Sequence, residues 1–531
     1  RAREKERERE RMISKAFLES LYLFYRFMLK RLRNSYTTYG RTHKCPPPDK
    51  LSTQTIVCDM EGALLRNSST FPYLMLVALE AGGFLRGLLL LSLYPLISCL
   101  SRELALRLMV FVCFLGVRKE SFRMGRAVLP KFFLEDVGVE GFEVLRRGGR
   151  RVCVSSMPTA MVEGFLKEYL NVEVVLGREL KVFGGYYTGL MEESEVKAGL
   201  ALEELLAGGR VTEDGIVGFG GYSSSLHQQL FTCCKEVYLV SEVEKRRWQQ
   251  LPRSSYPKPL VFHDGRIAFR PTPMSTLCMF LWLPLGFPLA VARALVFICL
   301  PYALSIPLLA TLGMRNRCVT SSTAHPKADG GSHGSRQLYI SNHRTLLDPL
   351  CIAAVLRRNV TATTYSVSPI NEWISPIRTI RLTRNREEDR RRMKNLLEEG
   401  DLVVCPEGTT CREPYLLRFS PLFAEVSQEV VPVALETSVT MFYGTSTSKF
   451  KYLDPLYFLM NPSPRYEVEF MGKVATGSIG GKECSSYEIA NHLQGQIGRL
   501  LGFECTNLTR KDKYLMLAGN EGIFEGDINR R

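Results

Sequence analysis

A single apolar block restricts how this chain can fold more than any other part of its sequence. Between residues 276 and 314 the only charged side chain is Arg293, and the uncharged stretches 276–292 and 294–314 each approach the ~20 residues that cross the hydrocarbon core of a bilayer. Lysines and arginines flank the block on both sides, which is typical of cytosolic ends. Its prolines favour kinked or re-entrant helices. We therefore predict a membrane helical hairpin over residues 266–314; two fully buried core helices are the alternative.

Two further segments are candidates for contact with a membrane. Residues 71–117 are rich in Leu, Phe and Val but carry scattered charges, so we expect two or three helices embedded at the membrane or lying on its surface. Residues 1–50 contain alternating charges followed by a basic amphipathic helix. That helix either lies on an anionic bilayer or docks on a neighbouring domain, because apolar helical stripes are also typical of protein cores.

The charge and cysteine content narrow the class of partner and the compartment. A formal net charge of +15 favours an anionic partner: nucleic acid, the cytosolic face of a membrane or a phosphorylated substrate. No nucleic-acid-binding motif is present, and the apolar blocks favour the membrane. The 15 cysteines have no paired C-x-x-C spacing, which indicates reduced thiols on the cytosolic side. We expect the endoplasmic reticulum membrane, with a mitochondrial membrane as the alternative.

Residues 51–265 have the pattern of an α/β domain with carboxylates at a strand end. A β-branched strand leads into Asp59 and Glu61, a second strand ends at Ser155, and Lys197 precedes a helical run. A carboxylate at such a strand end is suited to act as a nucleophile or as a Mg²⁺ ligand. A third strand follows at residues 215–219.

This order of strands and polar residues resembles the phosphatases of the haloacid-dehalogenase (HAD) family. In that family the first strand ends in Asp-x-Asp and the third in Gly-Asp, and these carboxylates hold Mg²⁺. Here Glu61 replaces the second aspartate, and no aspartate occurs between Asp214 and Asp264. A hard dication needs charged oxygen ligands, so Mg²⁺ binding is expected to be poor. The resemblance therefore implies a HAD-like domain whose phosphatase site (Asp59, Glu61, Ser155 and Lys197) is degenerate, and we predict no metal site.

A polar linker at residues 315–336 leads to a second α/β region at 337–531, which contains a candidate general base. A short apolar strand there ends just before His343, and Asp348 opens the following helix. At that spacing the carboxylate can bond the imidazole, fix its tautomer and stabilise the imidazolium while a proton is taken from a hydroxyl. A structural loop histidine is the alternative.

Candidate substrate-binding residues follow two later strands. Arginines spaced three residues apart offer guanidinium groups that match phosphate oxygens. A Pro-Glu-Gly-Thr-Thr turn offers a glycine that permits close backbone approach, together with side chains that can bond substrate hydroxyls. The predicted binding residues are Arg381, Arg384, Glu407, Gly408, Thr409 and Arg412.

These pieces together resemble the four acyltransferase blocks of the glycerolipid acyltransferases. The matching segments are 342–348 (Asn-His-Arg-Thr-Leu-Leu-Asp), 381–384, 406–409 and 431–433. With the HAD-like region upstream, the chain resembles the land-plant, membrane-bound glycerol-3-phosphate acyltransferases from about residue 52 to residue 522. Some members of that family keep an active phosphatase and make 2-monoacylglycerol. This sequence resembles the members whose phosphatase domain is damaged.

The resemblance implies acyl transfer from acyl-CoA to glycerol 3-phosphate at the sn-2 position, giving lysophosphatidic acid. It also implies that His343 is the base, that no cofactor is needed and that the product enters glycerolipids or the polyesters cutin and suberin. A lysophosphatidic acid acyltransferase would use the same blocks. The sequence is also compatible with a bifunctional acyltransferase and phosphatase, with an active phosphatase alone and with a non-catalytic membrane scaffold.

Overall fold

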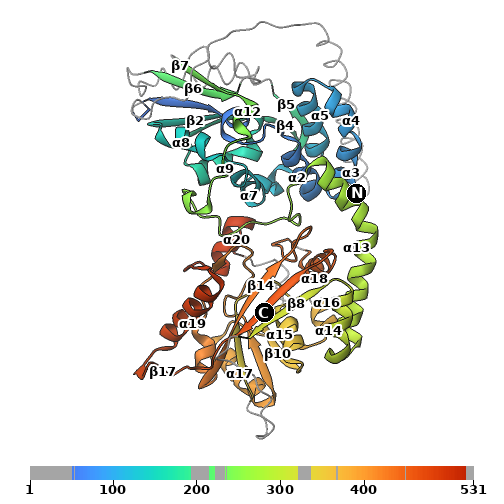
Figure 1. The fold of residues 1–531 in the computed structure, drawn as a ribbon, viewed down its shortest axis with the longest axis vertical. Coiled ribbons are helices and arrows are strands. Elements are labelled where there is room, and N and C mark those ends of the chain that lie inside the picture. Colours follow the sequence, from blue (N-terminus) through green and yellow to red (C-terminus); the bar gives the residue numbers. More distant parts are fainter. Residues whose placement is uncertain are drawn as a thin grey trace, which may run out of the picture. The chain divides into compact units, whose positions relative to one another are not determined.

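The computed structural model divides the chain into two compact units (Figure 1). Unit 1 comprises Arg1–Leu260 and Arg270–Leu277, and unit 2 comprises Val261–Phe269 and Cys278–Arg531. Residues 261–265, expected in the HAD-like domain, therefore belong to unit 2. The predicted helix within residues 1–50 and the candidate Lys197 lie outside the described residues. The structure describes residues 51–52, 54–192, 215–221, 234, 236–320, 336–365, 369–448 and 450–521.

Unit 1 is built on a parallel sheet whose strand order is β3-β2-β1-β6-β7. The central strand β1 is fully buried, because its β-branched and small residues are covered on both faces. The residues after β1 continue directly into the short helix η2. The strands are β1 (Thr55–Asp59), β2 (Arg150–Pro158), β3 (Val174–Arg178), β6 (Ile216–Gly221) and β7 (Glu236–Val240), and η2 is Met60–Leu64.

The apolar insertion of unit 1 forms more helices than expected. Gly83, at φ +82°, ends the first helix, and Ser101 caps the last by accepting a hydrogen bond from the Leu104 backbone N–H. These breaks divide the segment into α2 (Phe71–Gly82), α3 (Phe84–Ser92), α4 (Tyr94–Cys99) and α5 (Arg102–Phe114).

The other described elements of unit 1 include short helices around the sheet and an antiparallel pair of strands, β4 with β5. These elements are β4 (Leu180–Phe183), β5 (Tyr186–Met191), α6 (Met124–Ala127), α7 (Leu129–Leu134), α8 (Val139–Arg147), α9 (Thr159–Leu170) and α12 (Glu242–Lys245).

Unit 2 contains a mixed sheet in the order β11-β10-β12-β9-β14-β15-β8. Strands β11, β10, β12, β9 and β14 run parallel, and β15 is antiparallel to β14. Their bounds are β8 (Arg315–Thr320), β9 (Leu338–Ser341), β10 (Val360–Thr364), β11 (Arg378–Arg381), β12 (Asp401–Val404), β14 (Glu429–Ser438) and β15 (Arg465–Phe470). Because β9 and β12 are parallel neighbours, the polar residues that follow them meet at one edge of the sheet.

Helices cover this sheet on both sides. A buried cluster packs residues of α17 and α19 against β9, β12 and β14. Figure 1 shows α13 (Pro273–Cys299) and α14 (Tyr302–Thr311) on the side away from α19. The helices are α15 (Asp348–Leu356), α16 (Pro369–Ile374), α17 (Arg386–Glu399), α18 (Asp454–Leu459), α19 (Ser486–Leu501) and α20 (Arg510–Ala518).

The start of the predicted linker is in fact a strand. Arg315–Thr320 form β8, which pairs in parallel with β15 along its whole length. Arg315 and Arg317 of this edge strand are exposed, and such exposed polar residues suggested a linker.

The two helices of the predicted hairpin have very different lengths. Helix α13 (Pro273–Cys299) continues through Pro284, Pro288 and Arg293, and the break comes at Pro301, before the short α14 (Tyr302–Thr311). Among the described helices, α13 alone is long and apolar enough to cross a membrane. The two uncharged stretches on either side of Arg293 suggested two helices of similar length, whereas Arg293 lies inside the long helix.

The Arg293 guanidinium is fully buried, and its partners among the described residues are all backbone carbonyls. Nη1 donates to Leu459 O and Asn461 O, both at 2.6 Å, and Nη2 donates to Pro462 O at 2.9 Å. Nε donates to Leu312 O at 3.1 Å, beyond the end of α14. One side chain therefore fastens α13, α14 and the loop after α18 together.

We expect Arg293→Leu to lower the free energy of unfolding of unit 2 by roughly 3 kcal/mol, because several buried carbonyls lose a charged donor. A urea titration of the detergent-solubilised protein measures this loss. Arg317→Leu is the matched control, since Arg317 is exposed on β8. Equal unfolding midpoints for the two variants would show that Arg293 is not a structural anchor.

Candidate active site

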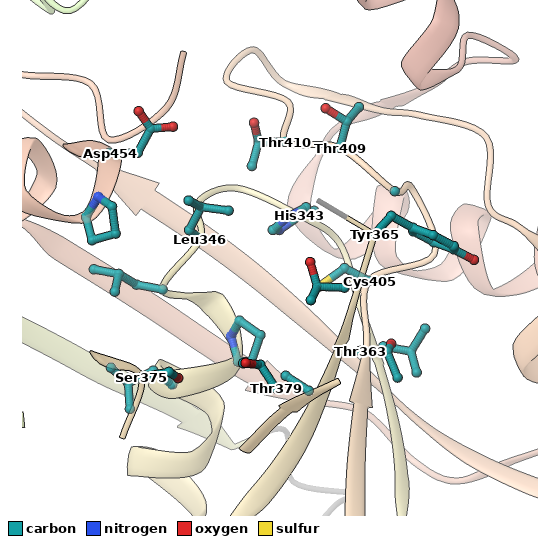
Figure 2. Close-up of a pocket in the computed structure, with 18 of the residues that line it drawn as sticks. His343, Leu346, Thr363, Tyr365, Ser375, Thr379, Cys405, Thr409, Thr410 and Asp454 are labelled. Atoms are coloured by element: carbon teal, nitrogen blue, oxygen red, sulfur yellow. The ribbon is translucent and has the colours of Figure 1, made fainter. Parts of the chain in front are cut away.

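A cavity of about 240 Å³ opens at the edge of the unit 2 sheet where β9, β10 and β12 end. Figure 2 shows His343 within it, with Thr409, Thr410 and Asp454 above it in the view and Ser375 and Thr379 below. Apolar residues of α13, including Phe297 and Ile298, contribute to the lining. The cavity therefore has a size and mixed polarity that suit a small polar substrate with an apolar group attached.

His343 and Asp348 form the hydrogen bond that their spacing predicted. His343 Nδ1 lies 2.9 Å from Asp348 Oδ2, while the histidine side chain is 16% exposed and the aspartate is fully buried. The bond engages Nδ1, which leaves Nε2 as the ring nitrogen available to a ligand in the cavity. This geometry is that of a general base held by a carboxylate.

The Asp348 carboxylate is fixed by donors other than the histidine. The backbone N–H of Arg344 donates to it at 2.6 Å, and that of Thr345 at 2.9 Å. The Tyr466 hydroxyl, on β15, donates to Oδ1 at 3.0 Å. Several donors converging on one buried carboxylate leave it a single orientation.

The environment of His343 favours the imidazolium. Burial opposes the charged form, but the neighbouring Cys405 sulfur and the Asp348 carboxylate outweigh it and raise the pKa of His343 to about 10. The neutral imidazole, which accepts a proton, is therefore the form populated at alkaline pH.

Glu407, predicted to bind substrate, instead holds the loop of the histidine. Its Oε1 accepts from the His343 backbone N–H at 2.8 Å and its Oε2 from the Leu417 N–H at 3.0 Å. Burial raises the pKa of Glu407 to about 7. Gly408, at φ +66°, and Thr409 do line the cavity. The turn thus presents its backbone and hydroxyls to the cavity while its carboxylate faces the protein.

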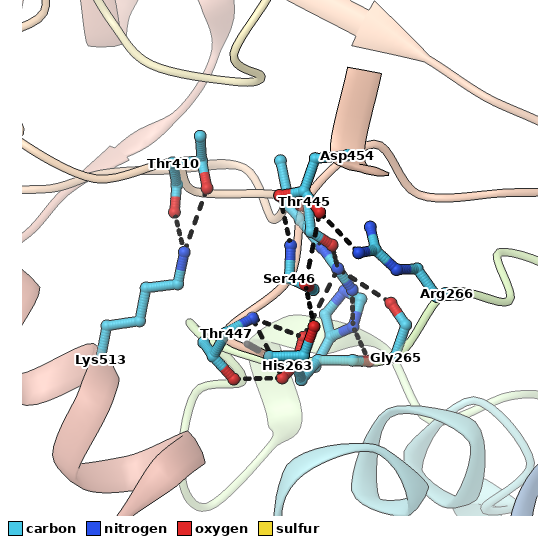
Figure 3. A network of polar contacts seen from close by, with 12 residues as sticks. His263, Gly265, Arg266, Thr410, Thr445, Ser446, Thr447, Asp454 and Lys513 are labelled. Carbon is cyan, nitrogen blue, oxygen red and sulfur yellow. Dashed lines mark hydrogen bonds and ion pairs between the residues drawn. The ribbon is translucent and has the colours of Figure 1, made fainter. Parts of the chain in front are cut away.

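The three predicted arginines are not among the residues that line this cavity. Arg381 is exposed and lies 3.6 Å from Glu372, and Arg384 is exposed at φ +70°. The side chain of Arg412 is 8% exposed, and it donates to Thr445 Oγ1 at 2.7 Å and to Gly265 O at 2.9 Å. Figure 3 shows this network around Thr445 and Gly265. Arg412 therefore ties residues 261–269 to the loop that follows β14.

Sequence reasoning missed the cations that do line the cavity: Lys451, Arg510 and Lys513. It also missed Cys405, which lines the cavity at the end of β12, with its sulfur 3.4 Å from Ser341 Oγ. A signal for two of the cations was present: Thr509 and Asp512 form a capping box, and the first turn of the helix it starts contains three basic residues, Arg510, Lys511 and Lys513.

The residues of the predicted phosphatase site of unit 1 bond one another. Glu61 Oε1 accepts from Ser155 Oγ at 2.6 Å, and Asp59 Oδ1 accepts from the Gly62 N–H at 3.0 Å. A Cβ on Gly221, at the end of β6, would lie 2.8 Å from Gly62 Cα, so no aspartate side chain fits there without movement. In the described part of the chain, no group of acidic, histidine or cysteine residues could hold a metal ion.

A lysine that the sequence did not single out lies at this site. Lys245 is fully buried, and its Nζ donates to Glu61 O at 2.6 Å and to the Ser68 hydroxyl. It reaches the end of β1 from α12, which follows the last strand of the sheet. The bonds to a carbonyl and a hydroxyl make it part of the local packing.

Comparison with known proteins decides the family. A family model described as "Glycerol-3-phosphate acyltransferase RAM2-like, HAD-like domain" matches residues 55–240, and an acyltransferase model matches residues 316–436. Probable glycerol-3-phosphate acyltransferase 3 of Arabidopsis thaliana is 52% identical over 96% of this chain and 98% of its own length. The chain belongs to the plant glycerol-3-phosphate acyltransferases.

Two further relatives agree with this membership. Probable glycerol-3-phosphate acyltransferase 2 of Arabidopsis thaliana is 48% identical over 96% of this chain and 98% of its own length. Glycerol-3-phosphate acyltransferase 1 of the same plant is 46% identical over 88% of this chain and 82% of its own length. The predicted family, the mixed α/β fold with its HAD-like and acyltransferase domains, and the acyltransferase class are thereby confirmed.

We expect the rate of this acyltransferase to rise with pH well above neutrality, because the raised pKa of His343 keeps it protonated at neutral pH. In Asp348→Asn the carboxylate that raises the pKa of His343 is lost, so the rise of the rate with pH shifts to lower pH. We also expect kcat to fall by about 10²-fold or more. The measurement is the pH profile of kcat/KM. Glu436→Gln, which removes an exposed carboxylate of β14, is expected to leave the profile unchanged. If the rise of kcat/KM with pH is the same in Asp348→Asn as in the wild type, Asp348 does not stabilise the His343 imidazolium.

Proposed function

We propose that this chain transfers an acyl group from acyl-CoA to glycerol 3-phosphate and releases lysophosphatidic acid. The observation that carries the proposal is the hydrogen-bonded pair His343 and Asp348 at the edge of a cavity that has both cationic and apolar lining residues. The names of the relatives, all glycerol-3-phosphate acyltransferases, support the acceptor.

In the proposed reaction, His343 Nε2 takes the proton of the acceptor hydroxyl. The hydroxyl oxygen bonds the thioester carbonyl carbon, and the carbon–sulfur bond then breaks. The imidazolium, stabilised by Asp348, returns its proton to the CoA thiolate. No covalent acyl-enzyme, cofactor or metal ion is part of this scheme.

The sn-2 hydroxyl is the proposed acceptor position, and glycerolipids or cutin and suberin are the proposed destination of the product. Both rest on the resemblance of the motifs to the plant family. Retention of the phosphate has separate support, because Glu61 is engaged by Ser155 and the backbones of Gly62 and Gly221 are in close contact. The engagement of Glu61 disfavours a catalytic Mg²⁺, which needs charged oxygen ligands.

We also propose that the enzyme is held in the endoplasmic reticulum membrane with its site facing the cytosol. Helix α13 exposes large apolar side chains such as Leu281, at 68%, and α3 exposes Leu85, at 84%. Large apolar side chains exposed along a helix are typical of lipid contact. A long acyl-CoA partitions into the same bilayer.

Replacing His343 with Ala is expected to lower the transfer of labelled glycerol 3-phosphate into lipid by about 10²- to 10⁴-fold, since the base is lost. His492→Ala, on α19, is the control and is expected to keep full activity. Substantial turnover by His343→Ala would exclude the proposed mechanism. Substituting lysophosphatidic acid for glycerol 3-phosphate in the same assay tests the alternative acceptor, and faster acylation of it would favour that alternative.

The product is expected to keep its phosphate, with no Mg²⁺-dependent phosphate release. Product analysis with oleoyl-CoA and glycerol 3-phosphate measures this and also locates the acyl group. Asp59→Asn, which preserves the shape of the side chain, is expected to leave the product ratio unchanged. If monoacylglycerol forms and disappears in Asp59→Asn, the HAD-like domain is an active phosphatase.

A further inference from the structure

The lining of the active-site cavity is strongly cationic. Among its described lining residues, Lys451, Arg510 and Lys513 are basic, and Asp454 is the one carboxylate. Asp454 Oδ1 lies 2.6 Å from the Arg266 guanidinium, so its charge is already balanced. The cavity therefore holds an excess of positive charge for a ligand to neutralise.

Lys513 is a buried cation whose bonds are to uncharged groups. It is 8% exposed, and its Nζ donates to the Thr410 carbonyl at 2.6 Å and to the Thr410 hydroxyl at 3.1 Å, as Figure 3 shows. In the described part of the chain no carboxylate forms an ion pair with it. Burial, reinforced by Arg412, lowers the pKa of Lys513 to about 8. A buried ammonium in such a setting is stabilised by an anion.

The position of these cations on α20 also favours an anion. Arg510 and Lys513 lie in the first turn of the helix, where the helix dipole disfavours positive charge. The single acidic residue of that turn, Asp512, accepts from the Thr509 N–H at 2.7 Å as part of the capping box. An anion beside this turn would interact favourably with both the cations and the helix end.

One aromatic ring holds the other two cations together. Lys451 Nζ donates to the Tyr514 hydroxyl and lies 4.5 Å from the ring centroid, and the Arg510 guanidinium lies 4.6 Å from the same centroid. Tyr514 itself is buried and lines the cavity. Cation–π contacts with a fixed ring assemble the two charges before any ligand arrives.

We propose that Lys513, Lys451 and Arg510 form the binding site for the phosphate monoester of the acceptor, glycerol 3-phosphate. This rests on the proposed function, in which a hydroxyl of the same molecule meets His343. The turn at residues 406–410, here called the threonine turn, connects this phosphate site to the base. Lys513 bonds Thr410, and the N–H of the next residue, Cys411, donates to the His343 carbonyl at 2.9 Å. The phosphates of CoA are the other source of the same chemistry, and the kinetics below separate the two.

The test compares Lys451→Gln, Arg510→Gln, Lys513→Gln and Lys513→Arg with the wild type. We expect each glutamine variant to raise KM for glycerol 3-phosphate about tenfold or more, as loss of one charge-assisted contact implies. KM for acyl-CoA stays within about twofold, and the preference for glycerol 3-phosphate over glycerol falls in parallel. Lys513→Arg retains part of the affinity because it retains the charge.

Lys511→Gln is the matched control on the same helix, since Lys511 is exposed and pairs with Glu521 at 2.8 Å. It is expected to behave as the wild type. If the glutamine variants raise KM for acyl-CoA and not for glycerol 3-phosphate, the site binds CoA phosphate and the proposal is overturned. The proposal is also overturned if the glutamine variants have the same KM for glycerol 3-phosphate as Lys511→Gln.

Direct binding separates failure of the site from failure of the proposed function. Calorimetric titration of the detergent-solubilised full chain with glycerol 3-phosphate needs no turnover. We expect the wild type to bind glycerol 3-phosphate and the Arg510→Gln/Lys451→Gln double variant to bind it at least tenfold more weakly. That result supports the site even if no acyl transfer occurs. Equal affinities in the two proteins overturn it, and this variant leaves the Lys513 bonds to the threonine turn intact.

Discussion

The buried carboxylate of Asp348 is the group on which the active site depends. It accepts hydrogen bonds from His343, from the Arg344 and Thr345 backbones and from Tyr466, which come from a turn and from a strand distant in the sequence. A buried charge must be fully bonded to be tolerated. The hydrogen bonds to the Asp348 carboxylate together fix the turn after β9, the start of α15 and the position of β15. The orientation of His343 follows from the same set of bonds.

The rest of the site is organised by side chains that bond backbone rather than ligand. Glu407 bonds the His343 and Leu417 N–H groups, and Asn342 exchanges two hydrogen bonds with Leu435 of β14. Arg344 donates to the carbonyls of Cys411 and Glu413, which fixes the loop after the threonine turn. Conspicuous charged residues of the motifs therefore hold the loops around the cavity, while the cations that line it come from η7 (Lys451–Leu453) and α20.

The two units show how the same kind of strand end leads to different outcomes. In unit 2 the ends of β9 and β12 leave a cavity between them, lined by His343 and Cys405. In unit 1 the corresponding space is filled, because Gly221 packs directly on Gly62 and Glu61 turns toward Ser155. A parallel sheet places residues at its carboxyl edge, but the side chains there decide whether a ligand can enter.

The sequence alone determined the two α/β domains, the family and the pair His343 and Asp348, because a turn of five residues is local and strand periodicity reports burial directly. Only the tertiary structure decided which cations reach the cavity. Lys513 contacts the threonine turn although the two are far apart in the sequence, so no local pattern predicts that contact. The tertiary structure also decided that Arg293 lies within a helix, where backbone carbonyls from distant segments satisfy its charge. Such long-range bonds depend on strand order and helix docking, which pattern and composition do not specify.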